Sequence, residues 1–332
     1  MSGDGIFSML RKNGLNPAKH YKAFIALNKK KLNSKRELHV GETYILPFNI
    51  ETEKEQAISP KIKTAPIVET ISEKASETVP LVETKNFPLF GKDKAMVTIE
   101  SHTLKNAVYY LVSGHGGPDP GAITTYQGKL ISEDEYAYDV TLRLARRLIS
   151  HGARVFLIIK DPDDGIRDER ILKVDYDEVN HPNKKISRNH ALRLKQRTKA
   201  VNNLHLKHRG KYQRLIVTHV DSRSKNKNID VFFYHHKKSK KGKSLTESIY
   251  DSFKQEYAKH QPNRTYSGTI GSRNLYLINN TLPPMTYIEL GNIKNDKDQK
   301  RVLNYENREA LAKWIFNGLL ADFKAQNKST IQ

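Results

Sequence analysis

Three ionisable residues lie where strand-like runs of the sequence end, and their types suit metal binding and proton transfer. His115 follows the apolar run 107-AVYYLV-112 inside a glycine-rich turn, while His219 and Glu289 lie at the ends of two later apolar runs. Runs of β-branched and aromatic residues that stop at such a turn predict buried strands. Side chains at the same ends of neighbouring strands converge on one crevice. We therefore expect these three residues to share a site.

A further carboxylate is expected where a helix begins, in 132-SEDEYAYDVTLRLARRL-148. Glu135, at the third helical position, is a candidate for this carboxylate. A capping box between Ser132 and Glu135 is a purely structural alternative for that glutamate. Two histidines and a carboxylate, with a fourth position left to water, form the ligand set of a catalytic zinc site.

These residue types predict a metal-dependent amide hydrolase. Zinc lowers the pKa of water and polarises a carbonyl, and a nearby unligated glutamate can move the proton to the leaving amine. The chain contains no cysteine, which excludes disulfides and thiolate ligands, so a metal site must use histidine and carboxylate groups.

The composition favours a polyanionic partner. The formal net charge is +21, from 57 Lys and Arg against 36 Asp and Glu. Such a charge suits nucleic acid, an anionic cell wall or a membrane surface. The sequence shows no recognition helix, zinc finger or aromatic RNA-binding pattern, so we expect no nucleic-acid partner. It also lacks an apolar run of about 18 residues, so we expect no membrane span.

The chain is expected to have three parts: a compact unit at 1–48, a flexible linker at 49–88 and a large domain at 89–326. The linker prediction rests on residues 51–86, which alternate charged residues with Ser, Thr and Pro and contain no aromatic residue. In the large domain strand-like and helical runs alternate, which predicts an α/β fold with a mainly parallel twisted sheet and helices on both faces. The expected strands are 107–112, 153–159, 214–220, 230–235 and 286–290, and the expected helices are 134–150, 187–204, 244–259 and 306–324.

Residues 105 to 324 resemble the zinc-dependent N-acetylmuramoyl-L-alanine amidases of the cell-division type. The resemblance rests on GHGGPDPGA, the helix from Ser132, 197-RTKAVN-202, LIVTHVDS and 283-PPMTYIELGNIKN-295, in that order. It implies that His115, Glu135 and His219 bind Zn²⁺ and that Glu289 is the catalytic acid/base. It also implies cleavage of the amide between N-acetylmuramic acid and L-alanine of the stem peptide. A catalytically inactive peptidoglycan-binding or amidase-regulating protein is the alternative.

Two departures from the family pattern concern the site. Val112-Ser113 stands where the family usually has Asp-Pro. A gap-free match of the helix would put Ala137 at the ligand position, whereas a shift of two residues brings in Glu135, with Glu133 as the alternative ligand. The long, partly acidic segment 161–185 is interpreted as a solvated insertion, with a lid or regulatory element as the alternative.

Two arginines have open assignments. We expect Arg197 to brace the sheet. Arg273 is expected to precede a strand near the site, where it would either orient an anionic peptide carboxylate or form a structural salt bridge.

The first 48 residues resemble a LysM module, a small βααβ fold that binds N-acetylglucosamine chains. The matching residues are Gly3-Asp4, Ile6, Leu10, Leu27-Asn28, Leu38, Gly41 and Tyr44 to Pro47. The resemblance implies peptidoglycan as the partner, bound through its glycan by the module and through its stem peptide by the crevice. It also implies a periplasmic or exported location in the bacterial envelope, although no signal peptide is visible in this chain. Whether a protein activator is needed is left open.

Overall fold

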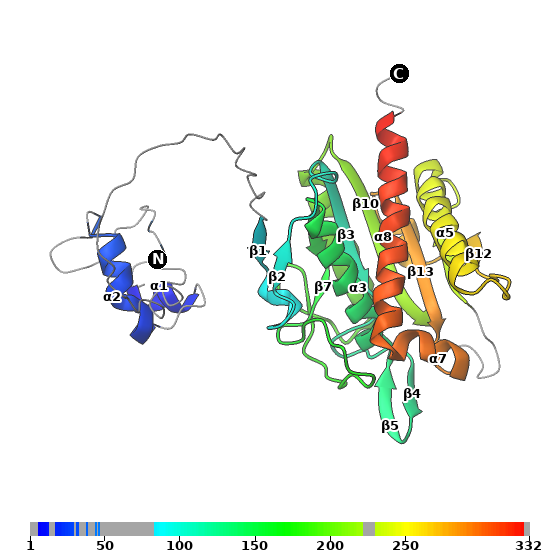
Figure 1. Ribbon diagram of the computed structural model, residues 1–332, viewed down its shortest axis with the longest axis horizontal. Coiled ribbons are helices and arrows are strands. Elements are labelled where there is room, and N and C mark those ends of the chain that lie inside the picture. The colour runs from blue at the N-terminus through cyan, green and yellow to red at the C-terminus, as the bar shows by residue number, and fades with distance from the viewer. Residues whose placement is uncertain are drawn as a thin grey trace, which may run out of the picture. The chain divides into compact units, whose positions relative to one another are not determined.

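The chain divides into two units, Met1–Glu77 and Thr78–Gln332 (Figure 1). The computed structural model describes residues 6–12, 17–29, 31–32, 38, 44, 46, 83–221 and 230–328. In the first unit, α1 (Ile6–Lys12) packs against α2 (Pro17–Leu27), and Ile6, Leu10 and Phe24 form a small buried cluster. The two helices fit the expected order. Most residues of the expected flanking strands lie outside the described ranges, so the LysM assignment stays a prediction.

A six-stranded sheet forms the centre of the second unit, and it is mainly parallel, as predicted. Strands β10 and β13 lie at its centre and pair in parallel, and the β11–β13 pair is the one antiparallel pair of this sheet. The spatial order is β12 (Thr269–Ser272), β11 (Phe232–His235), β13 (Met285–Asn292), β10 (Tyr212–Asp221), β3 (Ala107–Ser113) and β6 (Arg154–Leu157).

Helices cover both faces of this sheet because its central strands are apolar on both sides. Along β3, Tyr109 and Leu111 join one buried cluster while Val108 and Tyr110 join another. One face carries α3 (Glu133–Ser150), α5 (Lys240–His260) and α8 (Tyr305–Lys328), which lie over the sheet in Figure 1. The other face carries α4 (His190–Lys207) and α6 (Tyr276–Asn280). Helix α7 (Asp296–Leu303) connects β13 with α8.

The five strands and four helices that were expected with bounds in the large domain all correspond to observed elements, with bounds shifted by a few residues. The expected strand after Arg273 is wrong, because α6 follows there. The predicted linker, 49–88, ends too late in the sequence, because its last residues are structured. Strand β1 (Thr84–Asn86) pairs with β2 (Met96–Thr98), and the 3-10 helix η1 spans Pro88–Phe90. The rest of the expected linker lies outside the described residues.

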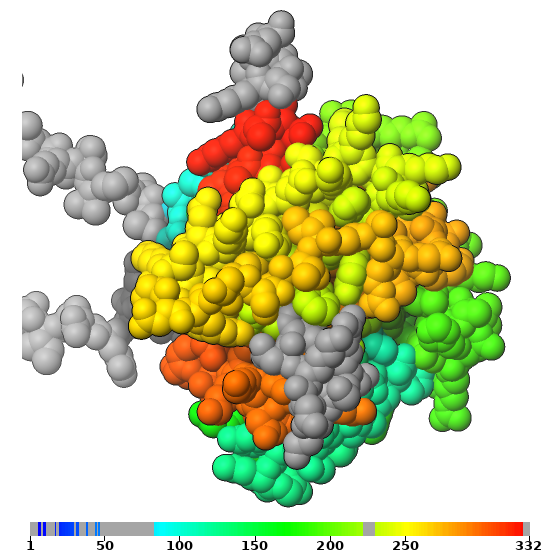
Figure 2. Space-filling model, turned by 90° about the vertical axis from the view of Figure 1, so that its right-hand side faces the viewer, coloured from blue at the N-terminus to red at the C-terminus, as the bar shows by residue number. Residues whose placement is uncertain are grey.

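Several short elements were not expected from the sequence. Strands β4 (Ile123–Tyr126) and β5 (Lys129–Ser132) form a hairpin, which makes the lower edge of the face shown in Figure 2, below α5 in yellow. Strands β7 (Ile159–Lys160), β8 (Val179–Asn180) and β9 (Lys184–Lys185) form a small sheet. Segment 161–185 is therefore not a simple solvated insertion, because it contains two of these strands and buries Asp161, Leu172 and Glu178.

No helix in the described ranges is long and apolar enough to cross a membrane.

A buried charge network ties α8 to α3. The Arg308 and Asp139 side chains are fully buried, and Arg308 Nε donates to Asp139 Oδ2 at 2.6 Å. The Arg308 guanidinium also donates to four backbone carbonyls, those of Val302, Leu303, Arg167 and Glu169. A buried ion pair is retained only with such complete hydrogen bonding, because the desolvation of both charges is costly.

We expect Arg308→Leu to lower the free energy of unfolding by about 3–5 kcal/mol, because it leaves Asp139 and several carbonyls buried with fewer partners. Urea unfolding followed by circular dichroism measures the change. Lys313→Leu, at an exposed position of the same helix, is the matched control and is expected to change stability by less than about 0.5 kcal/mol. Equal effects of the two substitutions would contradict the structural role of the network.

Candidate functional site

The strand register brings His115, His219 and Glu289 together. In the parallel pairing of β3 with β10, Ser113 lies opposite Thr218, and in that of β10 with β13, His219 lies opposite Glu289. The Gly114 N–H donates to the Thr218 carbonyl at 2.7 Å, so the chain leaves β3 beside the end of β10. The expectation that these residues share one end of the sheet is therefore met.

The glycines around His115 make room for the two imidazole rings. A Cβ atom on Gly114 would lie 2.4 Å from the His219 ring, and a Cβ on Gly121 would lie 2.6 Å from the His115 ring. His115 itself has φ 62°, a left-handed conformation that is uncommon for a residue with a side chain. The glycine-rich turn therefore serves the close packing of the rings, whose centroids are 4.9 Å apart.

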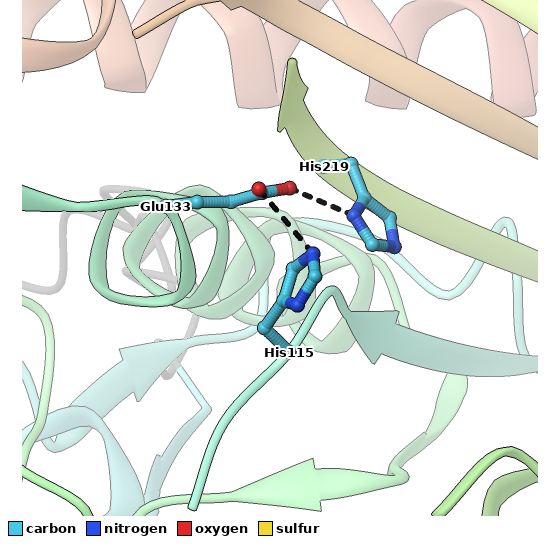
Figure 3. Close-up of side chains that lie close together, drawn as sticks. All are labelled: His115, Glu133 and His219. Carbon is cyan, nitrogen blue, oxygen red and sulfur yellow. Dashed lines mark hydrogen bonds and ion pairs between the residues drawn. The ribbon is translucent and has the colours of Figure 1, made fainter. Parts of the chain in front are cut away.

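The carboxylate that lies between the two histidines belongs to Glu133. Glu133 Oε1 is 2.8 Å from His219 Nδ1, and Oε2 is 3.3 Å from His115 Nε2 (Figure 3). The backbone N–H groups of Ala122 and Val220 each donate to this carboxylate at 3.0 Å. These four contacts hold the Glu133 side chain in one orientation at the start of α3.

Glu135 lies elsewhere, which corrects the expectation from the sequence. Its carboxylate accepts hydrogen bonds from Arg167 at 2.8 Å and from the Asp175 N–H at 3.0 Å. Two positions along a helix rotate a side chain by about 200°, so Glu133 and Glu135 cannot face the same partners. The capping-box alternative does not describe Glu135 either, since the Ser132 hydroxyl donates to Asp134 and α3 has no side-chain cap at Ser132.

His115, Glu133 and His219 each offer one ligand atom, and these atoms lie within 4.8 Å of one another. Among the described residues, this is the one group of potential metal ligands that includes histidine. Two imidazole nitrogens and a carboxylate oxygen are suitable ligands for zinc. The three side chains could therefore hold such a metal ion.

The charges of the three side chains are strongly coupled. Burial raises the pKa of Glu133, but its hydrogen bonds with His115 and His219 outweigh this and hold the pKa well below its usual range. Burial lowers the pKa of His115, yet hydrogen bonds with Asp119 and Glu133 outweigh it and raise the pKa to about 10. For His219 burial dominates, so its pKa is lowered.

A second layer of polar contacts fixes His115. Its Nδ1 lies 3.0 Å from Asp119 Oδ2, which also accepts a hydrogen bond from Arg193 at 2.6 Å. Arg197, which is 4% exposed, donates to the backbone carbonyl of His115 and so braces the turn that carries this histidine. Sequence reasoning had not singled out Asp119 or Arg193, although Asp119 lies within the quoted GHGGPDPGA motif.

Glu289 is buried beside this group without a full set of partners. Its side chain is 6% exposed, and Oε2 has no hydrogen-bond partner in the described part of the chain. Burial, together with the negative charges of Glu133 and Asp221, raises the pKa of Glu289 to about 8. A carboxyl with such a pKa can both accept and donate a proton near neutral pH.

A cleft of about 560 Å³ opens over these side chains. It is lined by His115, Glu133, His219 and Glu289 and by residues from α4 and α6, among them Arg193 and Tyr276. Tyr287 stacks on the His219 ring at a centroid distance of 4.6 Å. The cleft therefore exposes the possible metal ligands and the Glu289 carboxyl to one hollow of the surface.

Arg273 lies close to the site, as expected. Its guanidinium stacks on the Tyr234 ring at 4.9 Å. Its positive charge lowers the pKa of Glu289, but burial and the charges of Glu133 and Asp221 outweigh this effect.

Residues 110–321 match the Amidase_3 family, described as N-acetylmuramoyl-L-alanine amidase. This match covers more than half of the chain, and the chain belongs to that family.

Solved amidase structures resemble the chain at low sequence identity. The CwlD amidase from Clostridioides difficile, in complex with the GerS lipoprotein, is 21% identical, with 66% of this chain and 98% of that chain covered and a TM-score of 0.49. The catalytic domain of CwlV from Bacillus (Paenibacillus) polymyxa var. colistinus is 20% identical, with 64% and 96% covered and a TM-score of 0.46. AmiC2 of Nostoc punctiforme is 19% identical, with 67% and 97% covered and a TM-score of 0.45. A search of curated proteins gives no match.

The raised pKa of Glu289 predicts a pH-dependent effect on stability. In the metal-free protein, Glu289→Gln is expected to raise the free energy of unfolding relative to the wild type, increasingly from about pH 4.5 to about pH 8. In that range the folded wild type binds more protons than the unfolded chain, so its stability falls as the pH rises. Urea unfolding at pH 5 and pH 8.5 measures the difference.

Glu169→Gln, which changes an exposed glutamate, is the control and is expected to show little effect at either pH. A stability difference between Glu289→Gln and the wild type that is the same at both pH values would contradict the raised pKa.

Proposed function

We propose that this chain is a zinc-dependent peptidoglycan amidase that cleaves the amide bond between N-acetylmuramic acid and L-alanine of the stem peptide. The observation that supports it most directly is the group of His115, Glu133 and His219 beside the partly unpaired Glu289 carboxyl. Membership of the amidase family supplies the substrate class.

The donor set fits zinc better than a harder cation. His115, His219 and Glu133 would hold the ion through two nitrogen atoms and one oxygen, as in catalytic zinc sites with one open position. The Asp119 carboxylate contacts the second ring nitrogen of His115. Histidines that bind a metal commonly have such a carboxylate partner on the nitrogen that faces away from the ion. When bound, zinc would supply a Lewis acid that polarises the amide carbonyl and acidifies water.

The protein's own residues would then manage the proton. Glu289, in its ionised form, takes a proton from the attacking water as the water oxygen bonds to the carbonyl carbon. The same carboxyl gives that proton to the amide nitrogen as the carbon–nitrogen bond breaks, so the products are a carboxylic acid and an amine. One carboxyl serves both steps, because the proton that it takes from water is the proton that it returns to the leaving nitrogen.

The remaining parts of the chain extend this proposal to the cell envelope. A LysM-type module at the N-terminus would bind the glycan strand, and a flexible tether would raise the local concentration of stem peptides at the cleft. The net charge of +21 favours an anionic wall. The protein would then act as an exported or periplasmic enzyme.

The ligand assignment predicts different zinc affinities for two neighbouring substitutions. We expect Glu133→Gln to weaken zinc binding at least about 100-fold, because an amide replaces a charged ligand. Glu135→Gln is the matched control on the same helix turn and should keep wild-type affinity, because Glu135 faces Arg167. Competition with a chromophoric chelator measures both affinities. Loss of zinc from Glu135→Gln alone would reverse the assignment.

The proposed acid/base role predicts that Glu289→Gln retains zinc but lowers turnover by about 10²–10⁴-fold. Release of free stem peptides from purified cell wall, followed by mass spectrometry, measures the activity, and metal analysis measures the zinc content. Glu169→Gln serves as the active control. A wild-type protein that binds zinc and cell wall but releases no peptide would instead support the inactive, wall-binding alternative.

A further inference from the structure

A small pocket lies on the face of the sheet that carries α5 and α8, where the end of α5, helix α7 and the start of α8 come together (Figure 1). Its volume is about 190 Å³. Pockets that bind drug-sized ligands measure roughly 300–1,000 Å³, so this one suits a single ring with its substituents. It shares no lining residue with the cleft of the candidate site.

Part of the pocket lining is aromatic. It contains Trp314, the only tryptophan of the chain, and Tyr257. The two rings meet edge to face at a centroid distance of 5.4 Å. Trp314 is partly exposed. An aromatic side chain that is packed at one end and exposed at the other is typical of binding surfaces, because it offers apolar area beside water.

The rest of the lining is positively charged. It includes no acidic residue and four basic ones, which are Arg264, Lys297, Lys300 and Arg301. The two arginines share the fully buried Asp230 carboxylate, and Arg301 also pairs with Asp298 at 2.9 Å. These buried carboxylates hold the two guanidinium groups in place and compensate their charges.

Lys297 and Lys300 have no such compensation. Both are exposed, and neither forms an ion pair with another residue of the described ranges. Lys297 lies in the first turn of α7, where the helix dipole disfavours a cation. It is also four positions before Arg301, a spacing at which like charges repel each other on a helix. An anion bound in the pocket would relieve this repulsion.

We propose that this pocket binds a sugar residue that carries an anionic group, either a carboxylate or a phosphate. The apolar C–H face of a sugar ring can pack against the two aromatic side chains. Its hydroxyl groups can bond to the amide side chains of Gln261 and Asn307, which also line the pocket. The anionic group would lie against the two lysines, because their charges have no other partner. A neutral sugar or a bare anion would use only part of this lining.

Such a site would give the large domain a contact with an acidic glycan that is separate from the cleft over His115 and His219. The net charge of +21 draws polyanions to the surface without selecting among them, whereas a pocket with an aromatic part and a charged part selects an acidic sugar. This inference does not rest on the proposed amidase activity, because binding to the pocket is measured without turnover.

Trp314 allows a direct test, because it is the only tryptophan of the chain and lines the pocket. The tryptophan fluorescence of the full chain is expected to change saturably on titration with N-acetylmuramic acid or with N-acetylglucosamine-1-phosphate. The tighter of the two identifies the preferred anionic group. N-acetylglucosamine, which carries no charge, should bind at least about tenfold more weakly, because the charge-assisted contacts to the lysines are missing.

The double variant Lys297→Gln/Lys300→Gln is expected to bind both anionic sugars at least about tenfold more weakly than the wild type, for the same reason. Both positions are exposed, so the variant is expected to fold. Lys195→Gln/Lys199→Gln, at exposed positions of α4 on the other face of the sheet, is the matched control. It removes the same charge and should bind like the wild type.

Three results would overturn the proposal. Inorganic phosphate that binds as tightly as the sugar phosphate would indicate an anion site that does not recognise a sugar. An equal loss of affinity in the two double variants would indicate a general effect of net charge. The third is the absence of any fluorescence change with either anionic sugar, together with no heat of binding in a calorimetric titration.

Discussion

The shared hydrogen bonding of Glu133 with two imidazoles is the constraint on which the rest of this structure depends. A buried carboxylate at this point is tolerated because His115, His219 and two backbone N–H groups all contact it. That requirement fixes where β3 and β10 end, where α3 begins and why Gly114 and Gly121 have no side chain. Any change that moves one of these elements would leave a buried charge without its partners.

Three consecutive acidic residues at the start of α3 take three different directions. Glu133 faces the histidines, Asp134 lies near Glu178, and Glu135 binds Arg167. A helix N-terminus favours negative charge through its dipole, so this position can carry all three carboxylates. The rotation of about 100° per residue then directs them to the two histidines, to Glu178 and to Arg167. A single helix end thus connects the candidate site with segment 161–185.

The sequence predicted the strands that carry the site, because β3, β10 and β13 are long apolar runs that end at polar residues. It also predicted that His115, His219 and Glu289 lie at one end of the sheet, since parallel strands in register place their carboxyl ends together. The choice between Glu133 and Glu135 could not be made in this way, because it depends on the phase of α3 relative to the strands. Asp119 and Arg193 were missed because their contacts join residues that are far apart in the sequence.

The segment 161–185 shows why composition alone misled the interpretation. Its charged residues suggested a solvated insertion, yet Arg167 and Glu178 direct their charges inward, to Glu135 and Gly117. Backbone carbonyls of the same segment accept hydrogen bonds from the buried Arg308 and Arg143. A segment with so many buried polar contacts behaves as part of the core that supports the candidate site. Its charges therefore act as internal hydrogen-bond partners of the turn with His115 and of the start of α3, and only the remaining side chains face solvent.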